Sequence, residues 1–287
     1  MEQKKKEELV NNQVIIIDDN KKLTISDSQS QKFEIHAEKD LSLELEIKTS
    51  EEAMIYLDFK KCNGKVWVKI QTHSNANVTI FSWNNTNSLL EVEEEVYLAQ
   101  NAKLNMIYGE LNQSEVKRNS VYYLSDKQAK LNTCMAAIAE KKKQFVFHVH
   151  HNETDTKSDM RNYVIVQDRA EFYLDVTGKI EKGAHRSDAQ QINRILTLSD
   201  QHQAVVVPQL LIDDNDVVAG HAMTMGQIDE NQLYYMESRG IAREDAIQLV
   251  MLGYLTPIAY LLKEEYKVEV LTMIEEKVGA QCLISKK

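Results

Sequence analysis

A short motif that recurs about every 26 residues constrains the fold of this chain more than any other feature. Each copy places a polar residue and an alanine ahead of alternating apolar positions, as in Asn75-Ala76, Asn101-Ala102 and Gln128-Ala129. Fixed periods of this length are typical of stacked coils, in which alanine fits a crowded corner and the next strand packs against neighbouring coils. Looser copies follow at Arg169-Ala170 and Gln203-Ala204. Their wider spacing predicts inserted loops, one of them over residues 151–160.

Alternating apolar and polar residues predict strands from Val14 to about Val207. Leu41, Leu43, Leu45 and Ile47 show this period of two, and later runs are rich in β-branched and aromatic residues. Strand-like runs recur roughly every 10 residues, which fits either a sandwich or a solenoid. The alanine period favours the solenoid, so the sequence predicts a mainly β fold built as a parallel β-helix.

After Gly226 the pattern changes to helices. Asp229 and Gln232 have capping-box spacing, and Gly240 suits the end of the first helix. A second helix is predicted from Glu244 to Pro257, where proline interrupts it. A third helix is predicted to bury one face, formed by Val268, Leu271, Ile274 and Val278. The predicted layout is an N-terminal tail (1–12), a β-helix core (13–228) and a C-terminal α-helical domain (229–287).

Composition narrows the functional classes. The net charge of −10 makes nucleic-acid binding an unfavourable expectation, because phosphate backbones repel an acidic chain. Neither a membrane-spanning run nor a secretory signal is expected from the sequence. Cys62, Cys134 and Cys282 are widely separated and form no CxxC pair, so a disulfide framework is not expected. We expect a reducing, cytoplasmic location instead.

Several clusters could carry chemistry, and most favour a structural interpretation. His148 and His150 would share one face of a strand with His151 on the other, but no acidic or thiol partner has ligand spacing. The acidic run 213–216 lacks the glycine and distal glutamate of a calcium loop, so a turn is expected. Nucleophile and phosphate-loop motifs are missing, so an enzyme is not expected. A β-helical carbohydrate-active enzyme stays open as an alternative.

His221 is a different kind of histidine. It lies between Gly220 and Ala222, whose small side chains leave the imidazole accessible near the end of the predicted β region. An accessible imidazole can ligate iron or zinc. Structural histidines are more common, so the residue alone does not define a site.

Several segments follow one another in a fixed order along the second half of the chain: the run 208–222, Met225 to Asp229, Ser238-Arg239-Gly240-Ile241 and the segment from Glu244 to Gly253. Upstream segments at 154–158, 178–180 and 188–194 precede them. In these segments, from about His148 to Pro257, the chain resembles the SufB/SufD family of the SUF iron–sulfur cluster assembly system.

The resemblance implies a right-handed parallel β-helix whose C-terminal helical region docks a SufC-type ABC ATPase. It also implies side-by-side pairing with a SufB-type subunit and a transient iron–sulfur cluster shared between the two. SufB chains carry a cysteine on the strand before Pro208, where this chain has Asn193 to Leu196, and a glutamate where it has Ala222. His221 matches the SufD histidine, so the chain is similar to SufD.

By this resemblance, His221 is the expected metal and cluster ligand, with no catalytic residues. Leu233, Tyr234, Arg239 and Glu244 are the expected partner-binding residues. Typical SufD chains carry an N-terminal helical extension, whereas the strand pattern here begins at Val14. A stand-alone homodimeric binding protein is therefore the alternative to a heteromeric subunit.

Overall fold

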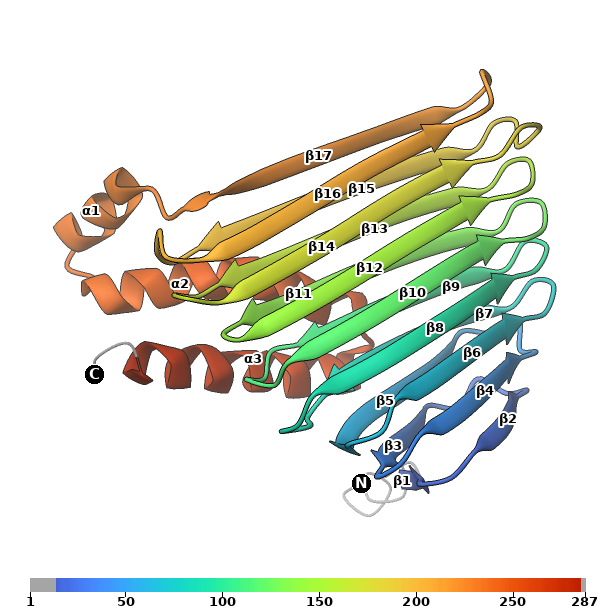
Figure 1. Ribbon diagram of the computed structural model, residues 1–287, viewed down its shortest axis with the longest axis horizontal. Coiled ribbons are helices and arrows are strands. Elements are labelled where there is room, and N and C mark those ends of the chain that lie inside the picture. The colour runs from blue at the N-terminus through green and yellow to red at the C-terminus, as the bar shows by residue number, and fades with distance from the viewer. Residues whose placement is uncertain (1–13, 285–287) are drawn as a thin grey trace, which may run out of the picture.

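The computed structural model describes residues 14–284 and contains a flattened parallel β-helix with helices on one side (Figure 1). The strands alternate between two sheets, which we call the odd sheet and the even sheet. The odd sheet consists of β1 (Val14–Ile17), β3 (Gln31–Ala37), β5 (Ala53–Cys62), β7 (Asn77–Asn84), β9 (Lys103–Glu110), β11 (Lys130–Ala139), β13 (Lys157–Val166), β15 (Asp188–Thr197) and β17 (Val218–Gln227). The even sheet consists of β2 (Lys21–Ile25), β4 (Leu41–Ile47), β6 (Val66–Thr72), β8 (Leu90–Leu98), β10 (Val116–Leu124), β12 (Lys142–His151), β14 (Glu171–Ile180) and β16 (Gln203–Ile212).

Each coil contributes one strand to each sheet, and neighbouring strands within a sheet pair in parallel. In the central coils the register runs without a shift, so that Leu104 pairs with Leu131 and Val116 with Lys143. Residues paired in this way face the same side, and alternate residues are buried between the two sheets. The predicted parallel β-helix is therefore confirmed.

The predicted alanine corners are confirmed at the first three copies. Asn75, Asn101 and Gln128 adopt φ of 62°, 55° and 63°, and the alanine after each is buried. Left-handed φ values are uncommon in residues other than glycine, and asparagine tolerates them best. They turn the chain from the even sheet to the odd sheet. The series continues with Asp155 and Arg186, at φ of 62° and 57°.

The two looser copies were assigned to the wrong corner. Ala170 and Ala204 lie at the opposite edge, where the chain returns from the odd sheet to the even sheet. Thr156 and Ser187 occupy the positions equivalent to the corner alanines, and both are buried. The spacing of 27 residues is kept from Ala129 to Thr156, so nothing is inserted over 151–160, which form an ordinary corner followed by the start of β13. The next interval, from Thr156 to Ser187, widens to 31 residues, because the connections before β14 and before β15 are longer than those of the preceding coil.

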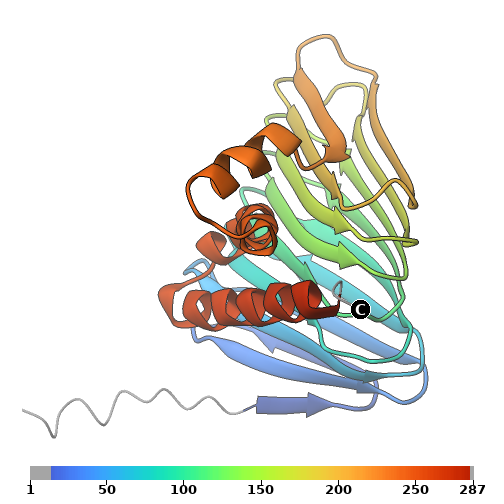
Figure 2. The same ribbon diagram turned by 90° about the vertical axis from the view of Figure 1, so that its left-hand side faces the viewer.

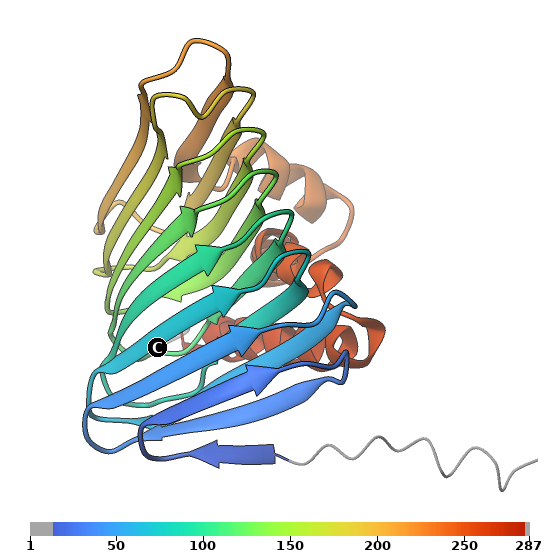
Figure 3. The same ribbon diagram turned by 90° about the vertical axis from the view of Figure 1, so that its right-hand side faces the viewer.

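The alternating pattern predicted strands up to about Val207, but the strands continue beyond it. β16 and β17 form a further coil that ends at Gln227. Pro208 lies within β16, whose one partner among the described strands is β14. Proline lacks an N–H donor and is tolerated in sheets at an edge of this kind. The first and last coils lie at opposite ends of the stack (Figure 3).

The chain then forms α1 (Glu230–Ser238), α2 (Arg243–Leu255), a 3-10 helix η1 (Thr256–Leu261) and α3 (Glu264–Ile284). The Asp229 carboxylate accepts a hydrogen bond from the Asn231 backbone N–H at 2.9 Å, and Gly240 follows α1 with φ of 88°. Helix boundaries therefore lie close to those predicted. No helix in the described range 14–284 is long and apolar enough to cross a membrane.

The helices cover the outer face of the odd sheet and leave the even sheet bare (Figure 2). A second hydrophobic cluster joins sheet residues such as Phe81 and Ile107 to Leu255 and Val270. The prediction for α3 was partly wrong, because Val268 is 61% exposed. The buried residues instead follow a strict i, i+4 spacing, which gives Tyr266, Val270, Ile274 and Val278.

Candidate functional site at the open end of the β-helix

The last coil leaves one end of the solenoid uncovered. Among the described strands, β16 and β17 each pair with one neighbour, so their other edges have no strand partner within residues 14–284. Positions that are buried in the lumen of the preceding coil are accessible in the last coil. Ile212, Met223 and Met225 face the lumen there and are 42%, 38% and 43% exposed. The open end is therefore an apolar surface bordered by two free strand edges.

His221 lies on β17 and faces this open lumen. It pairs in register with Gln191 on β15, whose side chain is buried between the sheets. His221 itself is exposed. The prediction of an accessible imidazole agrees with this position, whereas its role as a ligand stays a prediction.

Polar side chains line the lumen directly beneath His221. The Gln191 amide crosses to the even sheet, where its Nε2 donates to the Gln209 carbonyl at 3.0 Å. Gly178 leaves room for this crossing, because a Cβ there would lie 3.2 Å from Gln191 Nε2. At the next inward position of β15, Asn193 Oδ1 accepts a hydrogen bond from Nδ2 of its register partner Asn162 at 2.8 Å. Gln191 Oε1 and Asn193 Nδ2 are buried without a hydrogen-bond partner among the described residues.

The chain supplies few other metal donors at this end. Strand β15 carries Asn193 and Ile195 toward the lumen, and Ala222 follows His221 on the outer face. Within the described part of the chain, histidine, cysteine and carboxylate side chains form no group of three that could hold a metal ion. Met223 and Met225 share the lumen face with His221 and were not predicted to do so, although their i+2 and i+4 spacing from His221 on one strand is the sequence signal for it.

The predicted partner-binding residues lie in the helical region, apart from the lumen site. Leu233 is 2% exposed and belongs to the interior, so it is not available to a partner. Tyr234 is 73% exposed, and Arg239 and Glu244 are also exposed. The Arg239 guanidinium lies 5.2 Å from the centre of the Tyr235 ring. This arrangement of a cation and two tyrosines forms an accessible surface at α1.

The histidine cluster on β12 is structural. His148 and His150 lie on one face of the strand and His151 on the other, as predicted, and the structure shows that His151 faces the lumen. The two ring nitrogens of His151 lie 2.8 Å from the hydroxyls of Thr156 and Ser158. Burial lowers the pKa of His151 to about 4, so the imidazole is neutral at physiological pH.

The acidic run 213–216 forms a turn, as expected. The Asp214 carboxylate accepts hydrogen bonds from the backbone N–H groups of Asp216 and Gly183, at 2.9 and 3.0 Å. The hydrogen bond from Asp216 in particular lowers the pKa of Asp214. With its oxygens bound to backbone donors, Asp214 closes the corner before β17.

The thiols described in the structure are not available as ligands. Cys62 and Cys134 are free and buried. Burial raises the pKa of Cys62 to about 11 and that of Cys134 to about 12, so neither forms a thiolate at neutral pH. The side chain of Cys282 lies outside the described part.

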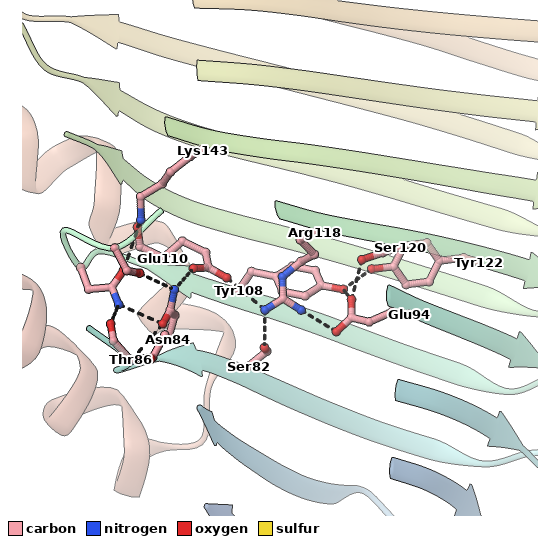
Figure 4. A network of polar contacts seen from close by, with 12 residues as sticks. Ser82, Asn84, Thr86, Glu94, Tyr108, Glu110, Arg118, Ser120, Tyr122 and Lys143 are labelled. Carbon is pink, nitrogen blue, oxygen red and sulfur yellow. Dashed lines mark hydrogen bonds and ion pairs between the residues drawn. The ribbon is translucent and has the colours of Figure 1, made fainter. Parts of the chain in front are cut away.

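A buried ionic network crosses the lumen in the middle coils (Figure 4). Arg118 donates to Glu94 at 2.6 Å and to Glu110 at 3.1 Å, and Tyr108 donates to Glu94 at 2.8 Å. Lys143 donates to the Glu110 carbonyl at 3.0 Å. Burial lowers the pKa of Lys143 to about 8. All four charged side chains are sealed from solvent, so the network supports the fold and offers no accessible site.

The comparisons with known proteins agree with this architecture. Residues 15–254 match the family described as SUF system FeS cluster assembly, SufBD core domain. The iron–sulfur cluster assembly protein SufD of Bacillus subtilis is 36% identical over 147 residues, which cover 51% of this chain and 34% of that protein. The Escherichia coli SufD is 28% identical over 131 residues, covering 45% of this chain and 31% of that protein. The matched stretches thus span about a third of these relatives.

A parallel β-helix with an open last coil and helices on one sheet defines a solenoid protein, in which each coil contacts only its neighbours. The chain belongs to the SufB/SufD family of iron–sulfur cluster assembly proteins, because the family model covers most of its length. Within that family it is SufD-like, as the resemblance to the Bacillus and Escherichia proteins indicates.

Proposed function

We propose that this chain is a SufD-type scaffold subunit that pairs with a SufB-type subunit and carries a SufC-type ABC ATPase. The open last coil is the observation that carries this proposal. Apolar lumen residues stay exposed between two unpaired strand edges, and both features favour association with another β-helix. As part of this proposal, the subunit works in the cytoplasm and performs no catalysis itself.

The cluster is cargo in this proposal, and the two subunits share its ligands. His221 supplies an imidazole at the pairing surface, and the described cysteines are too deeply buried to supply a thiolate. Thiolates are the usual ligands of iron–sulfur clusters. A SufB-type partner therefore supplies the sulfur ligands, and His221 completes one side of the site.

Replacing His221 by alanine is expected to lower cluster assembly by at least about tenfold, since a ligand is lost. Stability should change by less than about 0.5 kcal/mol, because the side chain is exposed. Cluster formation on the reconstituted complex is followed by visible absorbance, and stability by thermal unfolding. His73→Ala is the matched control, because His73 is an exposed histidine on a corner of another coil. Equal cluster formation by the wild-type and His221→Ala complexes would rule out the ligand role.

The helical region transmits ATPase motion to the β-helix in this proposal. Tyr234, Arg239 and Glu244 present the contact surface, and α2 and α3 anchor it on the odd sheet through apolar contacts. Removing residues 229–287 would uncover those contacts and unfold more than the docking surface. Point substitutions therefore test the docking more cleanly than a deletion.

Tyr234→Ala is expected to weaken binding of the SufC-type ATPase by about tenfold or more, because an exposed tyrosine is a typical interface hot spot. Val268→Ala is the control, since Val268 is an exposed apolar residue on α3. Binding is measured by isothermal titration with the purified ATPase. An unchanged affinity for Tyr234→Ala, or an equal loss in both variants, would contradict docking at α1.

A homodimer uses the same open end and is the second candidate. Two copies could meet through β16 and β17 because each copy exposes the same lumen residues and strand edges. Sedimentation of the isolated chain distinguishes the two: a stable dimer that does not exchange with a SufB-type subunit would favour the homodimer.

A further inference from the structure

The first coil is a second open end of the solenoid, at the opposite end of the stack from β17 (Figure 3). Among the described strands, β1 pairs with β3 alone and β2 pairs with β4 alone, so each has one edge without a strand partner. Val14, Ile15 and Ile16 of β1 are 40%, 40% and 55% exposed. The first coil therefore presents an apolar strand edge to solvent.

The strand β1 lacks the features that usually keep an exposed edge from pairing. Such edges commonly carry a lysine, a proline or an inward-pointing charge. The edge strand β16 contains Pro208, and β2 contains Lys21, which pairs with the lumen residue Leu43 and so faces inward. In contrast, β1 consists of one valine and three isoleucines. A strand of this composition is suited to pair with another strand.

Four charged residues lie at the corner between β1 and β2. Asp18 and Asp19 follow β1, Lys21 and Lys22 begin β2, and all four side chains are exposed. Lys22 lies 3.2 Å from Glu44, an exposed pair. Asp18, Asp19 and Lys21 form no ion pair with another described residue. One free edge thus ends in two anions, and the other begins with two cations.

The order of these residues makes the first coil complementary to a second copy of itself. The strands of the odd and even sheets run in opposite directions (Figure 1). A two-fold axis parallel to the strands therefore places β1 of one copy antiparallel to β2 of the other. Residues at equal distances from Asn20 then meet, which gives the pairs Asp19 with Lys21, Asp18 with Lys22, Ile17 with Leu23, Ile16 with Thr24 and Ile15 with Ile25.

The facing of the side chains agrees with this register. Directly opposed residues of an antiparallel strand pair share one face of the sheet. Ile15 and Ile17 pair with lumen residues of β3, so they face inward. Leu23 and Ile25 pair with lumen residues of β4 and also face inward. The register thus joins apolar residues inside the two lumens and opposite charges at the corners.

We propose that two copies of this chain associate through their first coils, with β1 of each copy paired to β2 of the other. The occupant of the apolar edge is a second copy because both halves of the contact, apolar and charged, are present in one coil. The inference does not depend on the proposed function. Association at the first coil leaves the last coil free for a SufB-type subunit.

The test reverses the charges at the corner and follows the isolated full-length chain by sedimentation at several concentrations. We expect a dimer for the wild type. The basic variant, Asp18→Lys/Asp19→Lys, and the acidic variant, Lys21→Glu/Lys22→Glu, should each form it at least about tenfold more weakly, because opposed like charges destabilise a strand pair and the two-fold axis repeats each contact. An equimolar mixture of both variants should restore the dimer, since every opposed pair again joins an anion to a cation.

Both charge variants stay net acidic, because the chain starts at −10, so overall attraction cannot produce the mixed dimer. Lys141→Glu/Lys142→Glu is the matched control and should sediment as the wild type does. These two adjacent lysines are also exposed at the start of an even strand, and Lys142 bridges Glu171 at 3.4 Å. Thermal unfolding of each variant shows that the chain is folded.

A monomeric wild type, a mixture that stays monomeric, or an equal loss in the control would each overturn the proposal. A dimer that survives both charge variants and is dissociated by Met225→Asp would also overturn it, because the contact would then lie at the last coil. The charge variants should pair with a SufB-type subunit as the wild type does. Failure of that pairing in the wild type would count against the proposed function alone.

Discussion

Met225→Asp should abolish pairing with a SufB-type subunit while leaving the isolated chain folded. Met225 faces the lumen of the last coil and is partly exposed in the free chain, so water can solvate the new carboxylate there. Once a partner covers the open end, the same carboxylate is buried without a cation and costs several kcal/mol. We expect affinity to fall at least about 100-fold, which corresponds to about 2.8 kcal/mol.

Thr224→Asp is the matched control, because Thr224 is the preceding residue of β17 and faces the outer side. Pairing is measured by co-purification and by sedimentation of the two purified subunits. An equal loss in both variants would mean that the partner does not seat on the lumen side. The isolated chain could also form a dimer that Met225→Asp dissociates and Thr224→Asp does not. That result would favour the homodimer over the heteromeric subunit.

Arg118→Ala should be the most destabilising single substitution in the buried network. The guanidinium bridges Glu94 and Glu110, and all three side chains are sealed from solvent. Burial alone would lower the pKa of Arg118, but the two glutamates overcome this effect and raise it. Its removal leaves two buried carboxylates without their shared cation, which typically costs about 3–5 kcal/mol. The shift is read from the midpoint of urea unfolding.

Lys117→Ala is the control for this variant. Lys117 precedes Arg118, faces solvent and bridges Glu91 at 3.1 Å, so its loss should cost no more than about 1 kcal/mol. Combining Arg118→Met with Glu94→Gln and Glu110→Gln should recover much of the lost stability, because neither buried carboxylate is left without its cation. Failure of that triple variant to recover would show that packing, and not the orphaned carboxylates, accounts for the loss.

The sequence carried enough information to predict the coil and its corners. Ala76, Ala102 and Ala129 mark one edge of the solenoid because that corner admits only a small buried side chain. Thr156 and Ser187 fill the same corner in later coils, so a search for alanine alone lost the period. The polar residue before the corner is the steadier signal, since the chain adopts a left-handed φ there in five coils.

The ionic network was harder to predict, because charged residues ordinarily face solvent. Glu94 and Arg118 occupy the same alternating phase as buried Val92 and Val116, which is the signal that marks them as inward-facing. Their pairing depends on Arg118 reaching along its own sheet and across to Glu110 on the other. A period-two pattern predicts whether a side chain points into the lumen or to solvent. It does not predict which charged side chains of different strands will contact one another.

His221 was identified by resemblance, and the structure adds where its side chain faces. The helical pattern alone could not predict that Leu233 is buried and Tyr234 exposed. Apolar residues of the short helix α1 are not confined to one face, so the sequence does not show which face packs inward. Both residues were reasonable candidates until the packing of the helical region was known.

The alternation of strands between two sheets restricts how such a chain can change in length. Gaining or losing one whole coil keeps every later strand on its own sheet, so the helices and the last coil keep their relation to each other. Gaining or losing a single strand would transfer His221 from the helix-covered sheet to the bare one. The imidazole would then point across the lumen from the opposite wall. Insertions and deletions that preserve the site are therefore restricted to an even number of strands.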